Sequence, residues 1–160
     1  MAEKVMPNEQ FLPVLVELAA DGNEVSLPVV GSSMTPFLVP GRDRVCFKKP
    51  VFPLKRGEIA LFQRRNGDFV LHRVAKVTKS AYWFLGDAQT EPEGPIFEEQ
   101  ICGVVTKAFW KDRWLEKTAP IWRFYSGFWL FVRPLRPYLR KIGSLFFRKA
   151  PLSGSLTKDT

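Results

Sequence analysis

The sequence predicts a mainly β fold with a short N-terminal helix and amphipathic helices near the C-terminus. Short β-branched and aromatic runs, separated by Gly and Pro, fill residues 24–109, as is typical of strands joined by turns. Apolar residues at helical spacing flank this region on both sides. With 160 residues, 46% hydrophobic and 25% charged, the chain has the size and composition of one folded domain with an appended segment.

Residues 9–20 are predicted to form the N-terminal helix. Apolar side chains recur there every three or four residues, and Asp21-Gly22-Asn23 ends the pattern. Pro13 falls in the first turn, where proline is tolerated because its missing N–H would have no helical acceptor. The apolar positions are Phe11, Val14, Leu15 and Leu18.

The central region is predicted to contain six strands. Asn66-Gly67 predicts a hairpin between the third and fourth, because both turn residues accept positive φ. The segments 31–42, 49–57 and 86–100 are expected to be loops. The predicted strands are residues 24–30, 43–48, 58–65, 69–77, 82–85 and 101–109.

Two amphipathic helices are predicted after residue 116. Arg133-Pro134 ends the first, and Pro137 suits the first turn of the second. The apolar face of the first helix contains Trp122, Tyr125, Trp129 and Val132. The predicted division of the chain is an N-terminal helix (1–23), a central β-domain (24–116), a basic aromatic helical segment (117–150) and a flexible tail (151–160).

The net charge of +8 lies in the basic aromatic segment. Residues 1–116 contain fifteen basic and fifteen acidic residues, whereas residues 117–150 contain eight basic residues, no acid and nine aromatics. Aromatic side chains favour the membrane interface and basic ones favour an anionic surface, so we expect peripheral binding to an anionic membrane surface. The alternative is that the segment packs on the β-domain with solvated arginines. No nucleic-acid partner is expected, because no nucleic-acid-binding motif is recognised.

The sequence gives no sign of a membrane-spanning segment or of a cleavable signal. No apolar run approaches the ~20 residues that span a bilayer, and the first residues lack the pattern of a cleavable signal. We therefore expect a cytoplasmic chain that is peripheral on the inner membrane face.

Cys46 and Cys102 are expected to be buried thiols rather than a disulfide. A single histidine excludes most histidine-rich metal sites.

Three short segments contain candidate chemistry. A serine-rich turn, residues 31–36, directly follows a predicted strand. His72 lies within a predicted strand, on the face opposite Leu71 and Arg73. Another strand ends in Gly86-Asp87. Taken singly, each has a structural explanation as a turn, a core histidine or a turn-capping carboxylate.

Taken together, the segments resemble the signal peptidase I superfamily. The resemblance covers residues 25–108 and is closest to the endoplasmic-reticulum and archaeal type, which has His where the bacterial type has Lys. It implies the β-fold that this superfamily shares with the peptidase domains of SOS-response repressors. The motifs that carry it are Ser33-Met34-Thr35-Pro36, Gly57-Glu58-Ile59, His72-Arg73-Val74 and Gly86-Asp87.

The resemblance implies a serine endopeptidase that cleaves precursor or leader peptides. Ser33 would be the nucleophile and His72 the general base, because a serine hydroxyl attacks an amide only when a neighbouring base takes its proton. A carboxylate behind the histidine would set its tautomer. Asp87 is favoured for this role and Glu93 is the alternative acid. No cofactor and no metal are implied.

The oxyanion hole and the substrate groove complete the predicted site. The superfamily pattern Ser-Gly-Ser-Met has its first serine replaced here by Gly31, so the backbone N–H of Ser33 and the side chain of Ser32 are the candidate oxyanion donors. Met34 and Pro36 are expected to line the substrate groove. The alternative function is a peptide-binding or membrane-docking module of the same fold with little or no catalysis.

Overall fold

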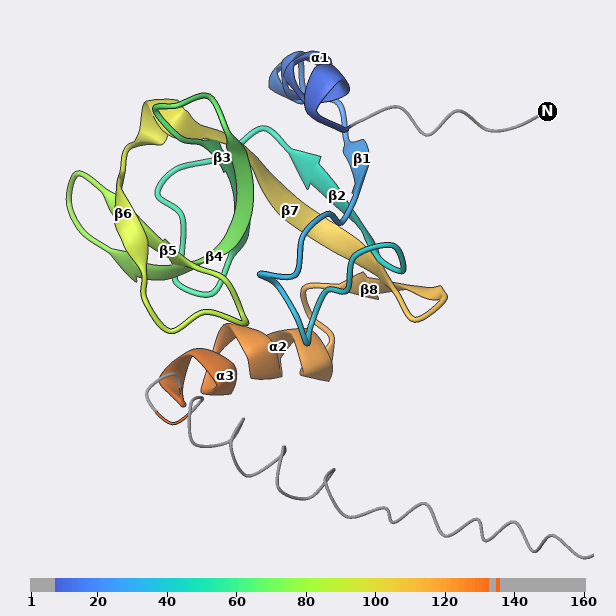
Figure 1. The fold of residues 1–160 in the computed structure, drawn as a ribbon, viewed down its shortest axis with the longest axis vertical. Helices are drawn as coiled ribbons and strands as arrows, with labels where there is room; N and C mark the ends of the chain where they lie inside the picture. The colour runs from blue at the N-terminus through green and yellow to red at the C-terminus, as the bar shows by residue number, and fades with distance from the viewer. Residues whose placement is uncertain (1–7, 133–134, 136–160) are drawn as a thin grey trace, which may run out of the picture.

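The computed structural model describes residues 8–132 and residue 135. Eight antiparallel strands form one sheet in the order β1-β2-β7-β3-β4-β5-β6, with β8 paired to β7 (Figure 1). The predicted mainly β fold is therefore confirmed. The strands are β1 (Val25–Pro28), β2 (Arg44–Lys48), β3 (Ile59–Gln63), β4 (Phe69–Val77), β5 (Tyr82–Leu85), β6 (Glu93–Ile96), β7 (Ile101–Trp110) and β8 (Arg113–Glu116).

The sheet is strongly curved and encloses two hydrophobic clusters. Register shifts interrupt the pairing of β2 and β3 with β7, and such bulges bend a strand and increase its twist. One cluster lies between β1, β2, β7 and α1 (Asn8–Ala20), and the other lies inside the curl of β3 to β6 (Figure 1). The second cluster is centred on the stacked rings of Phe62 and Phe84, 4.6 Å apart. The strand that carries His72, β4, lies in this curled half.

The hairpin between β3 and β4 follows the prediction from Asn66-Gly67. Gly67 has φ of +95°, and its N–H donates to the Arg64 carbonyl at 3.0 Å. The Asn66 side chain accepts from the Asp68 N–H, which stabilises the turn locally. This turn aligns the two strands so that Ala60 lies opposite His72.

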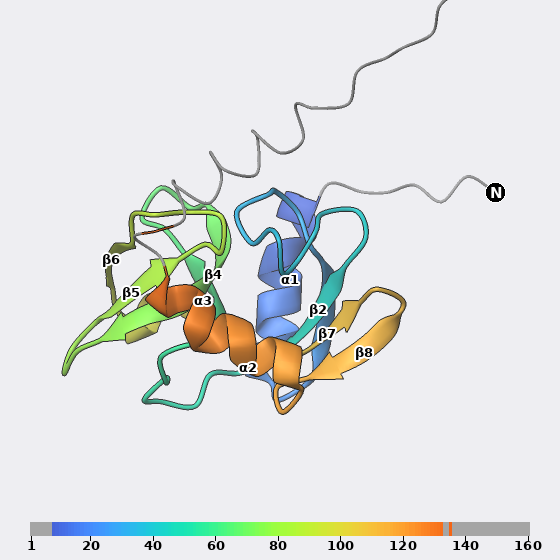
Figure 2. The ribbon, with the colours of Figure 1, turned by 90° about the horizontal axis from the view of Figure 1, so that it is seen from below.

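The first part of the basic aromatic segment packs against the sheet. It forms two short helices, α2 (Pro120–Ser126) and α3 (Phe128–Phe131), which lie below the sheet in the view of Figure 1 and follow each other end to end (Figure 2). Trp122 belongs to the first hydrophobic cluster, and its ring packs edge-on against Phe37 at 5.3 Å. The single helix predicted here is interrupted at Gly127, which serves as the C-cap of α2 and the N-cap of α3.

Two predicted boundaries are corrected by the structure. The expected loop at 86–100 contains β6 and a 3₁₀ turn, Glu98–Gln100, and β8 follows β7 where no strand is predicted. The helix predicted after Pro137 and the tail at 151–160 lie outside the described residues. Both cysteines are free, with Cys46 buried and Cys102 half-buried. Within residues 8–132, no helix is long and apolar enough to cross a membrane.

Candidate active site

Ser33 lies on the loop between β1 and β2, and apolar side chains hold this loop from inside. Met34, Phe37 and Leu38 are buried, and the Leu38 N–H donates to the Met34 carbonyl at 2.9 Å. The Trp110 indole N–H donates to the Phe37 carbonyl at 2.7 Å, which attaches the loop to β7. The half-buried Ser33 is therefore carried by a well-anchored loop.

The same packing changes one prediction about the substrate groove. Met34 is almost wholly buried within the first hydrophobic cluster, so the prediction that it lines an accessible groove is wrong. Pro36 is exposed on the loop and stays a candidate. Ser32 is also exposed, and its carbonyl accepts from the N–H and the hydroxyl of Thr35 at 3.1 and 2.7 Å. The oxyanion roles of Ser32 and Ser33 stay predictions.

His72 is buried on β4 with one ring nitrogen unsatisfied. Only 2% of the residue is exposed, and its Nδ1 has no hydrogen-bond partner among the described residues. Its ring lies edge-on to Phe62 at 6.1 Å. Burial is the main reason that the pKa of His72 falls from 6.5 to about 4; the charge of Glu93 opposes the shift and that of Arg64 adds to it. The imidazole is therefore neutral at pH 7 and able to accept a proton.

Arg73, the next residue, forms a buried ion pair with Asp87. Its Nε and Nη2 donate to the two carboxylate oxygens at 2.9 and 2.8 Å, and both side chains are fully buried. Its Nη1 donates to the Gly57 carbonyl at 3.0 Å, and the guanidinium lies 5.3 Å from the centre of the Phe37 ring. Arg73 therefore connects β4 to three other segments of the chain, which contain Phe37, Gly57 and Asp87.

The structure does not support the prediction that Asp87 orients His72. Both oxygens of Asp87 bond to Arg73, while Nδ1 of His72 has no partner within the part of the chain that the structure describes. The reason is the alternation of side chains along a strand: His72 and Arg73 are consecutive on β4, so they point to opposite faces. Asp87 lies on the face of Arg73.

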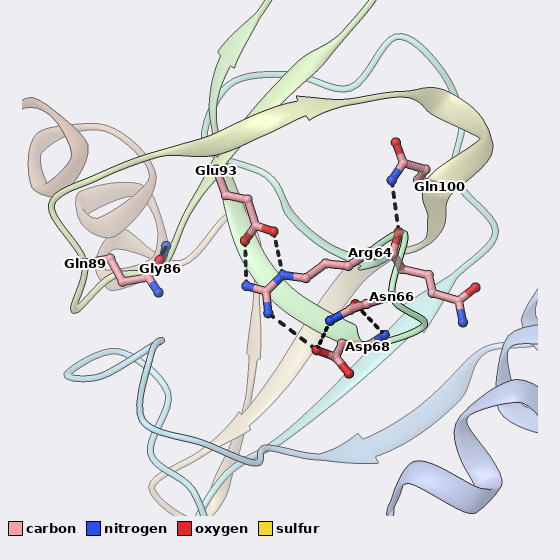
Figure 3. A network of polar contacts seen from close by, with 8 residues as sticks. Arg64, Asn66, Asp68, Gly86, Gln89, Glu93 and Gln100 are labelled. Atoms are coloured by element: carbon pink, nitrogen blue, oxygen red, sulfur yellow. Dashed lines mark hydrogen bonds and ion pairs between the residues drawn. The ribbon is translucent and has the colours of Figure 1, made fainter.

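The alternative acid, Glu93, exerts a charge effect on His72, but its carboxylate is also paired with an arginine. Arg64 Nε and Nη2 donate to its two oxygens at 2.5 and 2.7 Å, and Asp68 lies on the other side of the guanidinium (Figure 3). The bond to Arg64 lowers the pKa of Glu93, so this carboxyl is ionised at pH 7. Its charge acts on His72 without a hydrogen bond to Nδ1.

The turn at 86–88 links the serine loop to the strand of the histidine. The Ala88 N–H donates to the Ser33 carbonyl at 2.8 Å, and Asp87 in the same turn holds Arg73. Gly86 permits this close approach, since a Cβ there would lie 2.6 Å from the Ser33 carbonyl oxygen. The sequence segments around Ser33, His72 and Asp87 therefore meet at one turn.

Sequence reasoning misses three residues that stabilise this turn. Arg73 is one of them, although a charged side chain within a buried strand is a signal that a partner is required. The other two lie on the C-terminal helices, where the Ser126 hydroxyl accepts from Arg73 Nη1 at 3.0 Å and the Trp129 indole N–H donates to the Asp87 carbonyl at 2.9 Å. Trp129 belongs to the apolar face that its spacing predicts, which does not say what that face contacts, and Ser126 is not part of that face.

Gly57 offers a test of how closely α2 approaches this site. A Cβ at Gly57 would lie 2.6 Å from the Ser126 carbonyl oxygen, and φ is +94°. Gly67 has the same conformation, with φ of +95°, but a Cβ there would have no atom of the described residues within 4 Å. Gly57→Ala should therefore reduce the free energy of unfolding by about 1–3 kcal/mol more than Gly67→Ala, because only the former adds overpacking to backbone strain. Urea denaturation measures both, and equal losses would contradict the contact.

Comparison with known proteins does not assign the chain to a family. No protein-family model, no curated protein and no solved structure matches it. Within residues 8–132, no group of three or more His, Cys, Asp or Glu side chains is arranged to hold a metal ion.

Proposed function

We propose that this chain is a serine-type endopeptidase that resembles signal peptidase I and cleaves precursor or leader peptides. The observation that carries the proposal is the turn at 86–88, which bonds to the Ser33 carbonyl on one side and to the neighbour of His72 on the other. This turn fixes the serine loop relative to β4. A hydroxyl and a neutral imidazole are the two groups that such chemistry requires.

The reaction would proceed in two steps. The Ser33 oxygen attacks the scissile carbonyl while its proton passes to His72, and the protonated His72 then donates that proton to the leaving amine. A water molecule then attacks the acyl ester while its proton passes to His72, and the protonated His72 returns that proton to the Ser33 oxygen as the carboxylic acid product leaves. The low pKa of His72 keeps it in the proton-accepting form at pH 7, at the expense of the driving force for proton transfer.

A non-catalytic peptide-binding module of the same fold is the second candidate. It is favoured by the pairing of both candidate acids with arginines, Asp87 with Arg73 and Glu93 with Arg64, so that neither bonds to His72. Peptidases of the Ser–His–Asp type use such a carboxylate to hold the tautomer and stabilise the imidazolium. The two candidates differ in one measurable property, which is the need for the Ser33 hydroxyl.

We expect new protein N-termini in cells that express this chain and none in cells that express Ser33→Ala. Alanine keeps the backbone carbonyl that binds Ala88, so the variant should fold normally. Mass spectrometry of N-terminal peptides identifies the cleavage products, and immunoblotting confirms equal abundance of the two forms. Termini that persist with Ser33→Ala, or no termini with either form, would favour the non-catalytic module.

The proposed location is peripheral, on the inner face of a membrane. The support is the concentration of the whole net charge, with nine aromatics, in residues 117–150.

The positions of the cleavage sites would indicate the class of substrate. In the comparison of protein N-termini, cuts that follow hydrophobic segments would indicate signal-peptide processing. Cuts in small precursors without such segments would indicate leader-peptide maturation.

A further inference from the structure

The outer side of α2 and α3 is apolar where a helix on the surface of a domain is ordinarily polar. The apolar side chains on it are spaced four, three and four residues apart in sequence, which places them on the same side of the helices. Phe131 is the most exposed of them, at 77%. We call this surface the exposed aromatic face, and it consists of Phe124, Phe128, Phe131 and Leu135.

The opposite side of the same helices is anchored to the domain. Trp122 and Leu130 are buried, and Trp129 donates to the Asp87 carbonyl. The rings of Phe124 and Phe128 lie 5.2 Å apart, so the exposed aromatic face is continuous rather than a set of isolated side chains. The surface is therefore held in a fixed orientation beside the turn at 86–88.

We propose that the exposed aromatic face docks the protein on an anionic lipid surface. Phenylalanine rings enter the headgroup region of a bilayer, and basic side chains around them are attracted to anionic lipids. The charge of the surrounding sequence fits this partner: Arg123 is exposed next to Phe124, and residues 117–150 contain eight basic residues and no acid. A second copy of the chain would bring two such basic segments together, so their repulsion argues against it as the occupant.

Docking through this face would place the turn at 86–88, and the Ser33 loop bonded to it, behind α2 and α3, one helix diameter (~10 Å) from the lipid surface. This consequence rests on the proposed function, because it matters only if Ser33 acts on peptides that emerge from or lie on a membrane. The docking itself does not depend on catalysis. The two proposals can therefore fail separately.

The test is flotation with lipid vesicles. The full chain should float with vesicles made of equal parts phosphatidylglycerol and phosphatidylcholine, and much less with pure phosphatidylcholine. The double variant Phe128→Ser, Phe131→Ser should bind at least about tenfold more weakly, because two rings no longer enter the lipid. Ser33→Ala should bind as the wild type does, whether or not cleavage is detected.

A matched control is available at the other end of the molecule. Phe11 and Leu18 are exposed apolar residues on α1, which lies at the end of the fold opposite α2 and α3 (Figure 1). The variant Phe11→Ser, Leu18→Ser should bind the anionic vesicles as the wild type does, and circular dichroism checks that both double variants are folded. Equal loss in the two double variants would overturn the proposal.

Three further results would also overturn it. The first is failure of the wild-type chain to float with the anionic vesicles. The second is a dimer in analytical ultracentrifugation that Phe128→Ser, Phe131→Ser converts to a monomer, since the face would then bind a second copy. The third is that duplex DNA completely displaces the wild-type chain from the vesicles while Phe128→Ser, Phe131→Ser binds that DNA as the wild type does. Basic side chains alone would then explain the binding to the vesicles.

Discussion

Asp87→Asn should destabilise the protein by about 3–5 kcal/mol, because it leaves the guanidinium of Arg73 buried without a counter-charge. Both side chains are fully buried, so water cannot replace the lost carboxylate. Native domains of this size are stable by only about 5–15 kcal/mol, so the loss is a large share of the total. Urea denaturation followed by tryptophan fluorescence measures the free energy of unfolding of each variant.

Two comparisons separate this effect from an ordinary loss of a salt bridge. Glu58→Gln breaks the pair with Lys117, whose side chains are 26% and 35% exposed, and should reduce stability by less than about 1 kcal/mol. The double variant Arg73→Met, Asp87→Leu removes both charges and should recover at least half of the loss. If Asp87→Asn is no more damaging than Glu58→Gln, the buried pair does not have the role that we assign to it.

Stability should fall as the pH is lowered from about 6.5 to about 4, and His72 should account for about 3 kcal/mol of that fall. The folded protein keeps His72 neutral down to a pKa of about 4, whereas the unfolded chain takes up the proton near pH 6.5. The unfolded state thus binds more protons within this window, and stability rises with pH. The contribution of neutral His72 to the free energy of unfolding is therefore fully present above pH 6.5 and is lost as the pH falls to about 4.

The single histidine makes this prediction measurable without ambiguity. The imidazole C2 proton of His72 gives one NMR titration curve, expected near pH 4. His72→Leu should show no such loss of stability between pH 6.5 and 4, because leucine does not titrate. Glu93, whose pKa is lowered, loses its contribution only below its ordinary value of 4.5. A histidine that titrates near 6.5 in the folded protein would contradict the burial of the imidazole.

The strands with a clear apolar pattern could be predicted from sequence, and those with unusual turns could not. Residues 69–77 and 82–85 are predicted to be strands and form β4 and β5 with the same bounds. The turn into β8 is formed by Lys111 and Asp112, and both have positive φ. Such a turn is ordinarily predicted from Asn-Gly, so Lys-Asp gives no sign of it in the sequence. β6 contains Gly and Pro, which ordinarily indicate a loop.

The candidate site shows the same division between local and long-range information. Ser33, His72 and Asp87 are identified as candidates by their motifs, each within a few residues of sequence. Which carboxylate meets which base depends on the faces of β4 and on the position of a turn fourteen residues later, and Arg73 rather than His72 bonds to Asp87. The contribution of Ser126 is harder still to predict, because it depends on how α2 packs against the finished sheet.

The contacts that α2 and α3 make with the turn at 86–88 also set an order of events during synthesis. Chains emerge from the ribosome N-terminus first, and domains begin to fold as they do so. Ser126 and Trp129 follow every strand of the sheet in sequence, so the hydrogen bonds to Arg73 and to the Asp87 carbonyl form only after the last strand has been made. A nascent chain that still lacks these residues contains every strand of the described sheet in its sequence but cannot make the two hydrogen bonds that hold Arg73 and the turn at 86–88 to the helices.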